Sequence, residues 1–356
     1  MSPVLLAKHV GRIPPSAPLW PRRRRAARTN VLPKSARASF LSTLSSLWRG
    51  RAGSVARVLI AVLPLLWLYK IVSVAELYAG MQQLGVMRLV FGFLIGLVPY
   101  AFNALRWRML LGAASGTEDL PSVARLWRFN IEGVYFSLVP TGLAADVMRG
   151  YRAQAHVDAQ TSYAIVVIER LLGLGALFVA AGLARLSAPR ALPALFDAIV
   201  ISGCAAALAA LVIGPAVLRR VVRVPAMRAR FGPLAERLLA RKFWVALALG
   251  AVISLGGQMV SIVYVWVLAL AWAPDAELHQ YLQVVPFAFL ATFIPITPGA
   301  MGQREAVFVW LFAFVGLAPA QAVLLALCIA GLGYVTVLLG AALYFADLRK
   351  SRATSP

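Results

Sequence analysis

Charged residues are scarce in this sequence of 356 residues. Asp, Glu, Lys and Arg together make up 13% of the chain, whereas 61% of it is hydrophobic. A soluble domain needs more charge than this, and several apolar runs are long enough to span a bilayer. The deficit excludes a soluble enzyme or binding module and indicates a polytopic membrane protein.

Acidic residues are the scarcest charged group. The chain has 13 Asp and Glu against 35 Lys and Arg, which gives a formal net charge of +22. In a soluble protein such an excess would suggest nucleic-acid binding. Here the cations gather between the apolar runs, where they set membrane topology and meet anionic lipid. We therefore expect no nucleic-acid partner.

Cysteine and histidine are too few to suggest a disulfide framework or a metal centre. Cys204 and Cys328 both lie in apolar runs and lack metal-type spacing. His9, His156 and His279 lie in a tail or in connectors, and no zinc-protease, nucleophile-elbow, P-loop or dinucleotide motif is present. We expect no catalytic residue, no metal and no cofactor, and enzyme activity has little support.

Two polar tails flank the apolar part of the chain. Residues 1–53 hold eleven Lys or Arg and no acid, so they are expected to form a disordered basic cytoplasmic tail. Residues 347–356 are expected to form a short cytoplasmic tail. Between these tails lie apolar runs whose length predicts helices: 55–74, 89–105, 127–145, 162–184, 194–217, 243–272, 282–300, 305–318 and 321–345.

The basic connectors predict the topology. The positive-inside rule places these connectors and the N-terminal tail in the cytoplasm: 106–108, 149–152, 219–242 and 349–352. Since cytoplasmic connectors lie on both sides of 127–145, this run should enter and leave by the same face. Runs 282–300 and 305–318 form a similar hairpin from the opposite face. We predict about six full transmembrane helices plus two re-entrant elements, with both termini inside.

Both re-entrant elements contain a Pro/Gly break, Phe136–Gly142 (FSLVPTG) and Phe293–Gly299 (FIPITPG). An unpaired backbone group in lipid costs several kcal/mol, so such breaks must be covered by protein or line a wet cavity. Paired breaks in two halves of a chain indicate a transport site and an internal repeat. The break residues of interest are Pro140, Gly142, Pro295, Pro298, Gly299 and Gly302.

Ionisable residues inside the apolar part cluster around these breaks. Such residues are costly in a membrane, so each is a candidate for function. Arginine suits phosphate because its donors form a planar fork, and a helix N-terminus after a break adds free N–H groups. The alternative is that the acids and arginines form structural pairs, as for Arg128 and Glu132. The candidate substrate-binding residues are Arg149, Arg170, Arg304, Asp146, Glu169, Glu305 and Asn130.

Arg106 and Arg108 flank Trp107 at the end of an apolar run. This arrangement is typical of an interfacial anchor, which we expect here.

Four segments resemble one known family: NALRWRMLL at 103–111, PTGLAADVMRGY at 140–151, ERLLGL at 169–174 and PITPGAMGQRE at 295–305. The pattern is similar to the lysylphosphatidylglycerol synthase transmembrane domain family, a flippase-like integral domain also found in archaeal dolichol-phosphate glycosylation proteins. The resemblance implies a flippase-like transmembrane domain over 54–346. The chain departs from the family where Gly-Gly-Asp is often found, since it has Ala-Ala-Asp at 144–146.

The resemblance implies translocation of an anionic or aminoacylated phospholipid, or of a polyprenyl-phosphate-linked sugar, across a bacterial inner membrane. Arg149, Arg170 and Arg304 would meet the phosphate. Asp146, Glu169 and Glu305 would orient these arginines or meet a cationic head group. Two alternatives are a membrane-embedded transferase and a subunit that presents lipid to a separate glycosyltransferase or aminoacyl-transferase. The family's soluble aminoacyl-transferase domain has no counterpart after the last span, so lipid aminoacylation is not expected.

Overall fold

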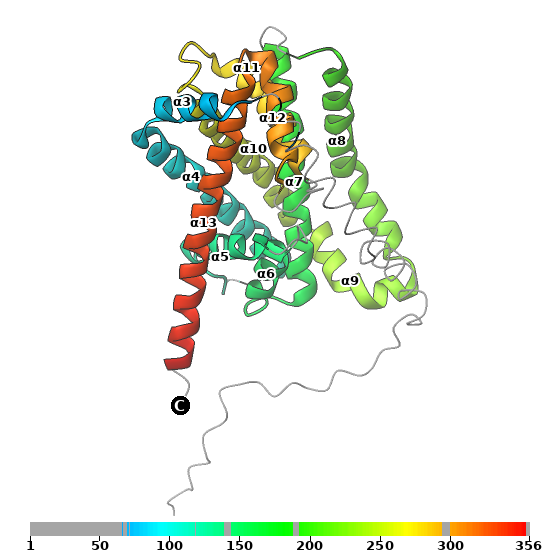
Figure 1. The fold of residues 1–356 in the computed structure, drawn as a ribbon. Helices are drawn as coiled ribbons and strands as arrows, with labels where there is room; N and C mark the ends of the chain where they lie inside the picture. Colours follow the sequence, from blue (N-terminus) through cyan, green and yellow to red (C-terminus); the bar gives the residue numbers. More distant parts are fainter. Residues whose placement is uncertain are drawn as a thin grey trace, which may run out of the picture. The chain divides into compact units, whose positions relative to one another are not determined.

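The computed structural model describes residues 72–117, 119–138, 144–187, 192–293 and 300–353, together with Leu66 and Lys70. Within these ranges all regular secondary structure is helical (Figure 1). The predicted all-α polytopic membrane fold is confirmed. The expected basic tail at 1–53 lies outside the described residues.

Five of the described helices are long and apolar enough to cross a membrane. They contain 27 to 35 residues, which exceeds the length needed for a hydrocarbon core of about 30 Å. These helices are α4 (Val86–Ser115), α7 (Ala159–Ser187), α8 (Leu195–Val221), α10 (Arg241–Ala269) and α13 (Pro319–Ala353). They correspond to five of the six predicted spans. The sixth, at 55–74, lies almost entirely outside the described residues.

Two pairs of short helices flank the predicted breaks. The first pair is α5 (Val123–Tyr135), which continues into the 3₁₀ turn η1 (Phe136–Leu138), and α6 (Ala144–Ala153). The second pair is α11 (Leu278–Phe293) and α12 (Gln303–Phe312), followed by η3 (Ala313–Val315). Helices of 10 to 16 residues rise only about 15 to 24 Å, too short to span a bilayer.

The break segments 139–143 and 294–299 themselves lie outside the described residues, and with them Pro140, Gly142, Pro295, Pro298 and Gly299. The helices on either side of each break show at which end of the bundle the chain enters and leaves. In Figure 1, α4 ends and α7 begins at the lower end of the bundle, and α5 and α6 lie there between them. The chain therefore enters and leaves the first pair by one end, whereas α11 and α12 lie towards the upper end.

Two further helices lie beside the bundle. Helix α3 (Val74–Leu84) begins with a reciprocal cap in which the Ser73 N–H donates to Glu76 Oε2 at 2.9 Å and the Glu76 N–H donates to Ser73 Oγ at 3.2 Å. Helix α9 (Pro225–Leu239) joins α8 to α10 and carries part of the basic connector. Helix α9 lies outside the predicted spans, and α3 shares only Val74 with the predicted run 55–74.

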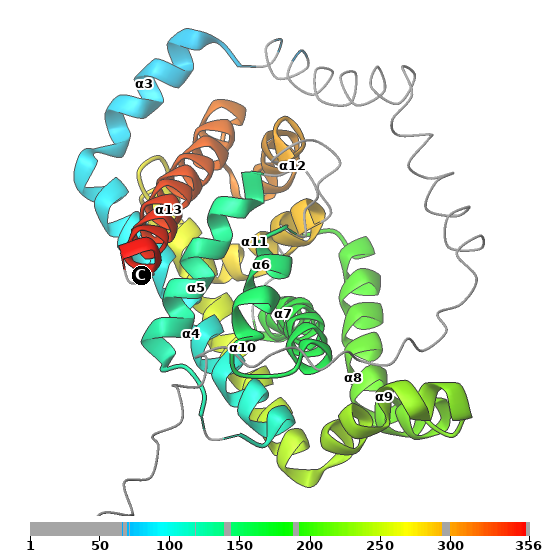
Figure 2. The same ribbon diagram turned by 90° about the horizontal axis from the view of Figure 1, so that it is seen from below.

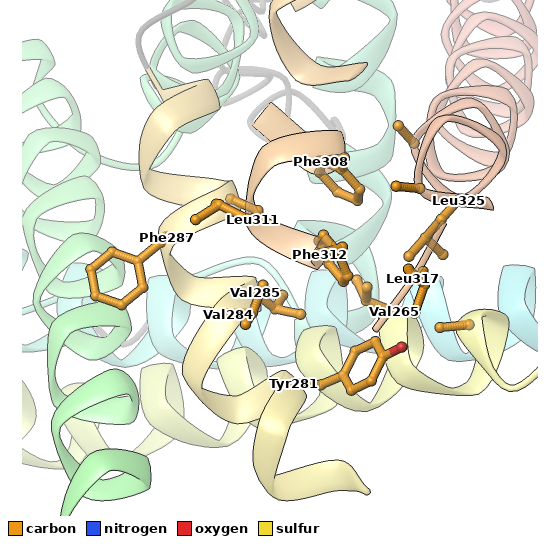
Figure 3. Close-up of a cluster of buried hydrophobic side chains, with 14 of the residues drawn as sticks. Val265, Tyr281, Val284, Val285, Phe287, Phe308, Leu311, Phe312, Leu317 and Leu325 are labelled. Atoms are coloured by element: carbon orange, nitrogen blue, oxygen red, sulfur yellow. The ribbon is translucent and has the colours of Figure 1, made fainter. Parts of the chain in front are cut away.

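An aromatic core covers the second pair of short helices (Figure 3). The rings of Phe308 and Phe312 on α12 stack with their centroids 4.8 Å apart, and Tyr281 on α11 meets Phe312 edge-on at 5.7 Å. Phe287 on the same helix points towards α8, where its ring lies 4.7 Å from that of Phe196. These short helices are therefore packed against protein, as an interrupted helix at membrane depth requires.

Helix α7 is the central element of the bundle. It packs against α4, α6, α8, α10 and α11, and the view along the bundle shows α7 among them (Figure 2). Glu169, about one third of the way along α7, is buried among these helices, whereas the neighbouring Arg170 is partly exposed.

Gly340 of α13 makes the closest backbone approach to α5, and we expect Gly340→Ala to destabilise the protein. A Cβ atom at this position would lie 2.2 Å from the Ile131 carbonyl oxygen, which no side-chain rotation can move away. Overpacking of this kind costs about 1 to 3 kcal/mol. Gly331→Ala on the same helix is the matched control, because no atom lies within 4 Å of its Cβ position. Thermal unfolding in detergent should show a lower melting temperature for Gly340→Ala alone; equal temperatures would contradict the close approach.

Cysteine labelling tests the shared end of α4 and α7. In a chain whose native cysteines are replaced by Ala, Asp119→Cys after α4 and Ala155→Cys before α7 should react from the same side of the membrane, since both positions are exposed. Glu277→Cys, in the exposed connector before α11, should react from the other side. Labelling of Asp119→Cys and Ala155→Cys from opposite sides would show that α5 and α6 together cross the bilayer.

Candidate functional site

Glu169 is the centre of a buried ion cluster. It lies ten residues after the start of α7, about 15 Å along the helix, and only 1% of its side chain is exposed. Its Oε1 accepts a hydrogen bond from Arg106 Nε of α4 at 3.1 Å, and its Oε2 accepts from Arg149 Nη2 of α6 at 2.5 Å. One carboxylate thereby joins a full span, the central helix and the short helix that follows the first break.

The cluster continues from Arg149 to a second carboxylate. Arg149 Nη1 lies 3.4 Å from Asp146 Oδ1, and Arg170 also forms an ion pair with Asp146. The Arg149 guanidinium lies over the Trp107 ring, 4.6 Å from its centroid. We call Arg106, Asp146, Arg149, Glu169 and Arg170 the central ion cluster.

The central ion cluster carries an excess of positive charge. Its three arginines outnumber its two carboxylates by one. The two break segments at 139–143 and 294–299 contain no ionisable side chain, so they cannot balance it. Unbalanced charge in a membrane interior is costly, so a bound anion would stabilise the cluster by balancing its excess positive charge.

A cavity of about 320 Å³ opens beside the cluster. It lies between α4, α6, α7, α10 and α11, and every member of the central ion cluster except Asp146 lines it. Neutral polar side chains complete the polar part of the wall: Asn103 of α4, and Ser254, Gln258 and Ser261 of α10. Phe289 and Phe293 of α11 form part of its apolar wall.

The chain segments next to the two breaks meet at Arg170. Asp146 follows the first break by three residues and is ion-paired with Arg170. Phe293 is the last described residue before the second break, and its ring centroid lies 5.5 Å from the Arg170 guanidinium carbon. The cavity is thus bordered by residues from both halves of the chain.

The other predicted site residues lie outside this cavity. Arg304 Nη2 donates to Glu305 Oε1 at 2.7 Å, so these two residues form a pair of their own at the start of α12. Asn130 of α5 is buried, and its Nδ2 lies 3.5 Å from the Tyr100 carbonyl oxygen. The structure therefore brings Asp146, Arg149, Glu169 and Arg170 together, whereas a substrate-binding role for Arg304, Glu305 and Asn130 stays a prediction.

Gly302 shapes the return from the second break. Its φ of 74° lies in the left-handed region that favours glycine, and its N–H donates to Glu305 Oε2 at 2.6 Å. Ala300, two residues earlier, also has a positive φ, of 56°. A positive φ at alanine is strained, so the surrounding structure must hold this turn in place.

The expectation that Arg106 is an interfacial anchor is wrong. Only 7% of its side chain is exposed, and its Nη1 donates to Ser254 Oγ at 2.6 Å in addition to the bond with Glu169. The apolar run suggested a helix end near residue 105, but α4 continues to Ser115 and keeps Arg106 inside the bundle. Arg108 is exposed and donates to the Pro121 carbonyl, as expected of an anchor.

A second ion cluster contains as many acids as arginines. Glu132 accepts from Arg128 at 3.0 Å and from Arg152 at 2.7 Å, and Arg128 also pairs with Asp347 at 2.6 Å. Its two arginines and two carboxylates balance, and they link α5, α6 and α13. This arrangement fits the structural alternative stated above for Arg128 and Glu132.

Metal binding has no support within the described ranges, where no group of three or more His, Cys, Asp or Glu side chains could hold an ion.

The fold and the central ion cluster define a multi-pass membrane protein with a charged, partly open cavity between its helices. The chain belongs to the family of the lysylphosphatidylglycerol synthase transmembrane region, whose model matches residues 54–340. No curated protein and no solved structure shows significant similarity to it. The resemblance seen in the sequence motifs is confirmed, and it indicates a membrane function related to lipid.

Proposed function

We propose that this protein binds the anionic head group of a membrane lipid, or of a lipid-linked compound, in the central cavity and moves it between the leaflets. The membrane would be the bacterial inner membrane, with both termini in the cytoplasm. The observation that carries the proposal is the excess of arginines over carboxylates in the central ion cluster, beside a cavity.

An unsatisfied donor supports an anionic ligand. Arg149 Nε is buried and has no hydrogen-bond partner among the described residues, although its two Nη atoms are paired with Asp146 and Glu169. A buried donor without an acceptor costs about 1 to 3 kcal/mol, which a phosphate oxygen would recover. The guanidinium fork suits such an oxygen geometrically.

The cavity size supports a lipid whose tails stay outside. A volume of about 320 Å³ is at the lower end for ligand sites and fits a phosphate with a small polar substituent. Acyl or prenyl chains would remain in the bilayer while the head group passes through the polar interior. This division of one ligand between protein and lipid is what a flippase or scramblase requires.

The transferase alternative lacks a nucleophile in the cavity. Ser254 accepts from Arg106 and donates to the Gly250 carbonyl at 2.7 Å, and Ser261 donates to the Gly257 carbonyl at 2.9 Å. Both hydroxyls are therefore already engaged, and neither has a base beside it. We favour translocation for this reason.

Reconstitution tests the proposal. Liposomes containing the protein and a head-group-labelled phosphatidylglycerol should lose inner-leaflet label to an external quencher faster than empty liposomes. Arg149→Gln should slow this exchange about tenfold or more, because it removes a positive charge from the cavity wall. Arg241→Gln, which removes an exposed cation outside the cavity, is the matched control and should not change the rate.

Equal amounts of monodisperse protein must be compared, so that a folding defect is not read as a transport defect. The same exchange rate in protein-containing and empty liposomes, across phosphatidylglycerol and a prenyl-phosphate sugar, would reject the proposal.

A further inference from the structure

The carboxylates of the central ion cluster are already occupied by arginine. Glu169 accepts from Arg106 and Arg149, one to each oxygen. Asp146 is ion-paired with Arg149 and Arg170, but its Oδ2 accepts no hydrogen bond among the described residues, and it does not line the cavity. Glu169 is the carboxylate in the cavity wall, so an ammonium group entering the cavity would have to displace a guanidinium from Glu169 to gain a carboxylate partner.

The net positive charge of the cluster also disfavours a head group that carries an ammonium group. The three arginines of the cluster outnumber its two carboxylates by one, so the cluster attracts a phosphate and repels an ammonium group. Glu169 and Arg106 are buried, so charges next to them are screened less than charges at an open surface. A head group that carries both a phosphate and an amino group is therefore disfavoured relative to one that carries the phosphate alone.

The cavity wall also offers neutral groups that suit hydroxyls. Asn103 has no hydrogen-bond partner among the described residues, so its amide is open to a ligand both as donor and as acceptor. Gln258 Nε2 lies 3.4 Å from the Gly173 carbonyl, which leaves its Oε1 open as an acceptor. A hydroxyl both donates and accepts, so it can satisfy either amide.

We propose that the cavity selects a phosphate bearing an uncharged hydroxylated substituent, a glycerol or a sugar, and discriminates against an aminoacylated head group. This inference rests on the proposed function and narrows its ligand. The phosphate would lie at Arg149 and Arg170, and the hydroxyls at Asn103 and Gln258.

A competition experiment with the full-length protein in detergent tests this selectivity. A fluorescent short-chain phosphatidylglycerol is displaced by unlabelled short-chain phosphatidylglycerol, by its lysyl ester, by dodecyl phosphate and by a dodecyl-phosphate hexose. Phosphatidylglycerol or the phosphate hexose should compete about tenfold or more better than the lysyl ester. Whichever of the two competes better identifies the source of the hydroxyls.

Two variants separate the contributions. Arg170→Gln removes the excess charge and one partner of Asp146, so discrimination against the lysyl ester should fall to about threefold or less. Asn103→Leu should weaken both hydroxylated ligands about threefold or more while leaving dodecyl phosphate unchanged. An Asn103→Leu variant that weakens all four ligands equally would overturn the assignment of the hydroxyl site.

Different results would reject the ligand selectivity proposed here and the lipid translocation on which it rests. Equal or tighter binding of the lysyl ester overturns this inference alone and leaves lipid translocation standing. Binding that Arg149→Gln does not reduce, or no binding of any of the four ligands, overturns the proposed function as well.

Discussion

Glu169→Leu is expected to prevent accumulation of folded protein. The substitution removes the carboxylate that pairs with both Arg106 and Arg149, and it leaves three arginines of the cluster with one acid. Removing one partner of a buried ion pair costs about 3 to 5 kcal/mol, a large share of the stability of a typical protein. The measurement is the yield of monodisperse protein in detergent and its melting temperature.

The double variant Arg106→Met/Glu169→Leu is the control for this effect. It removes one charge of each sign, and apolar replacement of a buried pair is often neutral for stability. Ser254 keeps its hydrogen bond to the Gly250 carbonyl, so its buried hydroxyl is not left without a partner when Arg106 is replaced. The double variant should recover most of the yield lost in Glu169→Leu. Normal yield of the single variant would show that the Glu169 carboxylate is less buried than its exposed fraction of 1% indicates.

The positions of the breaks and most of the central ion cluster could be predicted from the sequence. Pro/Gly segments in apolar runs marked the places where the short helices α5 and α11 end and where α6 and α12 begin. Asp146, Arg149, Glu169 and Arg170 were found because charge within an apolar run is expensive and therefore visible. These signals are local, so no knowledge of helix packing was needed.

Other parts of the site depend on packing and could not be predicted in this way. Arg106 lies beyond the end of an apolar run, and only the continuation of α4 to Ser115 places it inside the bundle. Asn103 and Gln258 carry no charge, so they cost little in a span and leave a weak sequence signal. The separation of Arg304 from the cavity depends on its bonds to the neighbouring Glu305.

Within one cluster, stability and ligand binding make different demands. Glu169 is needed to hold Arg106 and Arg149 at membrane depth, so its removal should mainly lower the yield and melting temperature of the folded protein. Arg149 and Arg170 contribute to the excess positive charge of the cluster, so their removal should mainly lower ligand affinity and the transport rate. Substitutions that keep the charge but change the shape of the side chain separate these two contributions.

Arg149→Lys is expected to lower transport about tenfold or more while protein yield stays near normal. The arginine donates to Asp146 and to Glu169 through two different nitrogens, and its guanidinium carbon lies over the Trp107 ring. Lysine keeps the positive charge, which preserves much of the ion pairing, but its ammonium cannot reproduce the planar fork. The readout is the rate of head-group exchange in liposomes at equal protein content.

Arg304→Lys gives the comparison at the second break. Arg304 bonds to Glu305 through Nε at 3.1 Å and Nη2 at 2.7 Å, and it is not part of the cavity wall. We therefore expect its transport rate to fall by less than about threefold. Equal losses in the two variants would show that both breaks contribute an arginine to the ligand, as their sequences suggested. Normal transport by Arg149→Lys would instead assign the central ion cluster a purely structural role, because a phosphate held by the guanidinium fork cannot be held equally well by a single ammonium.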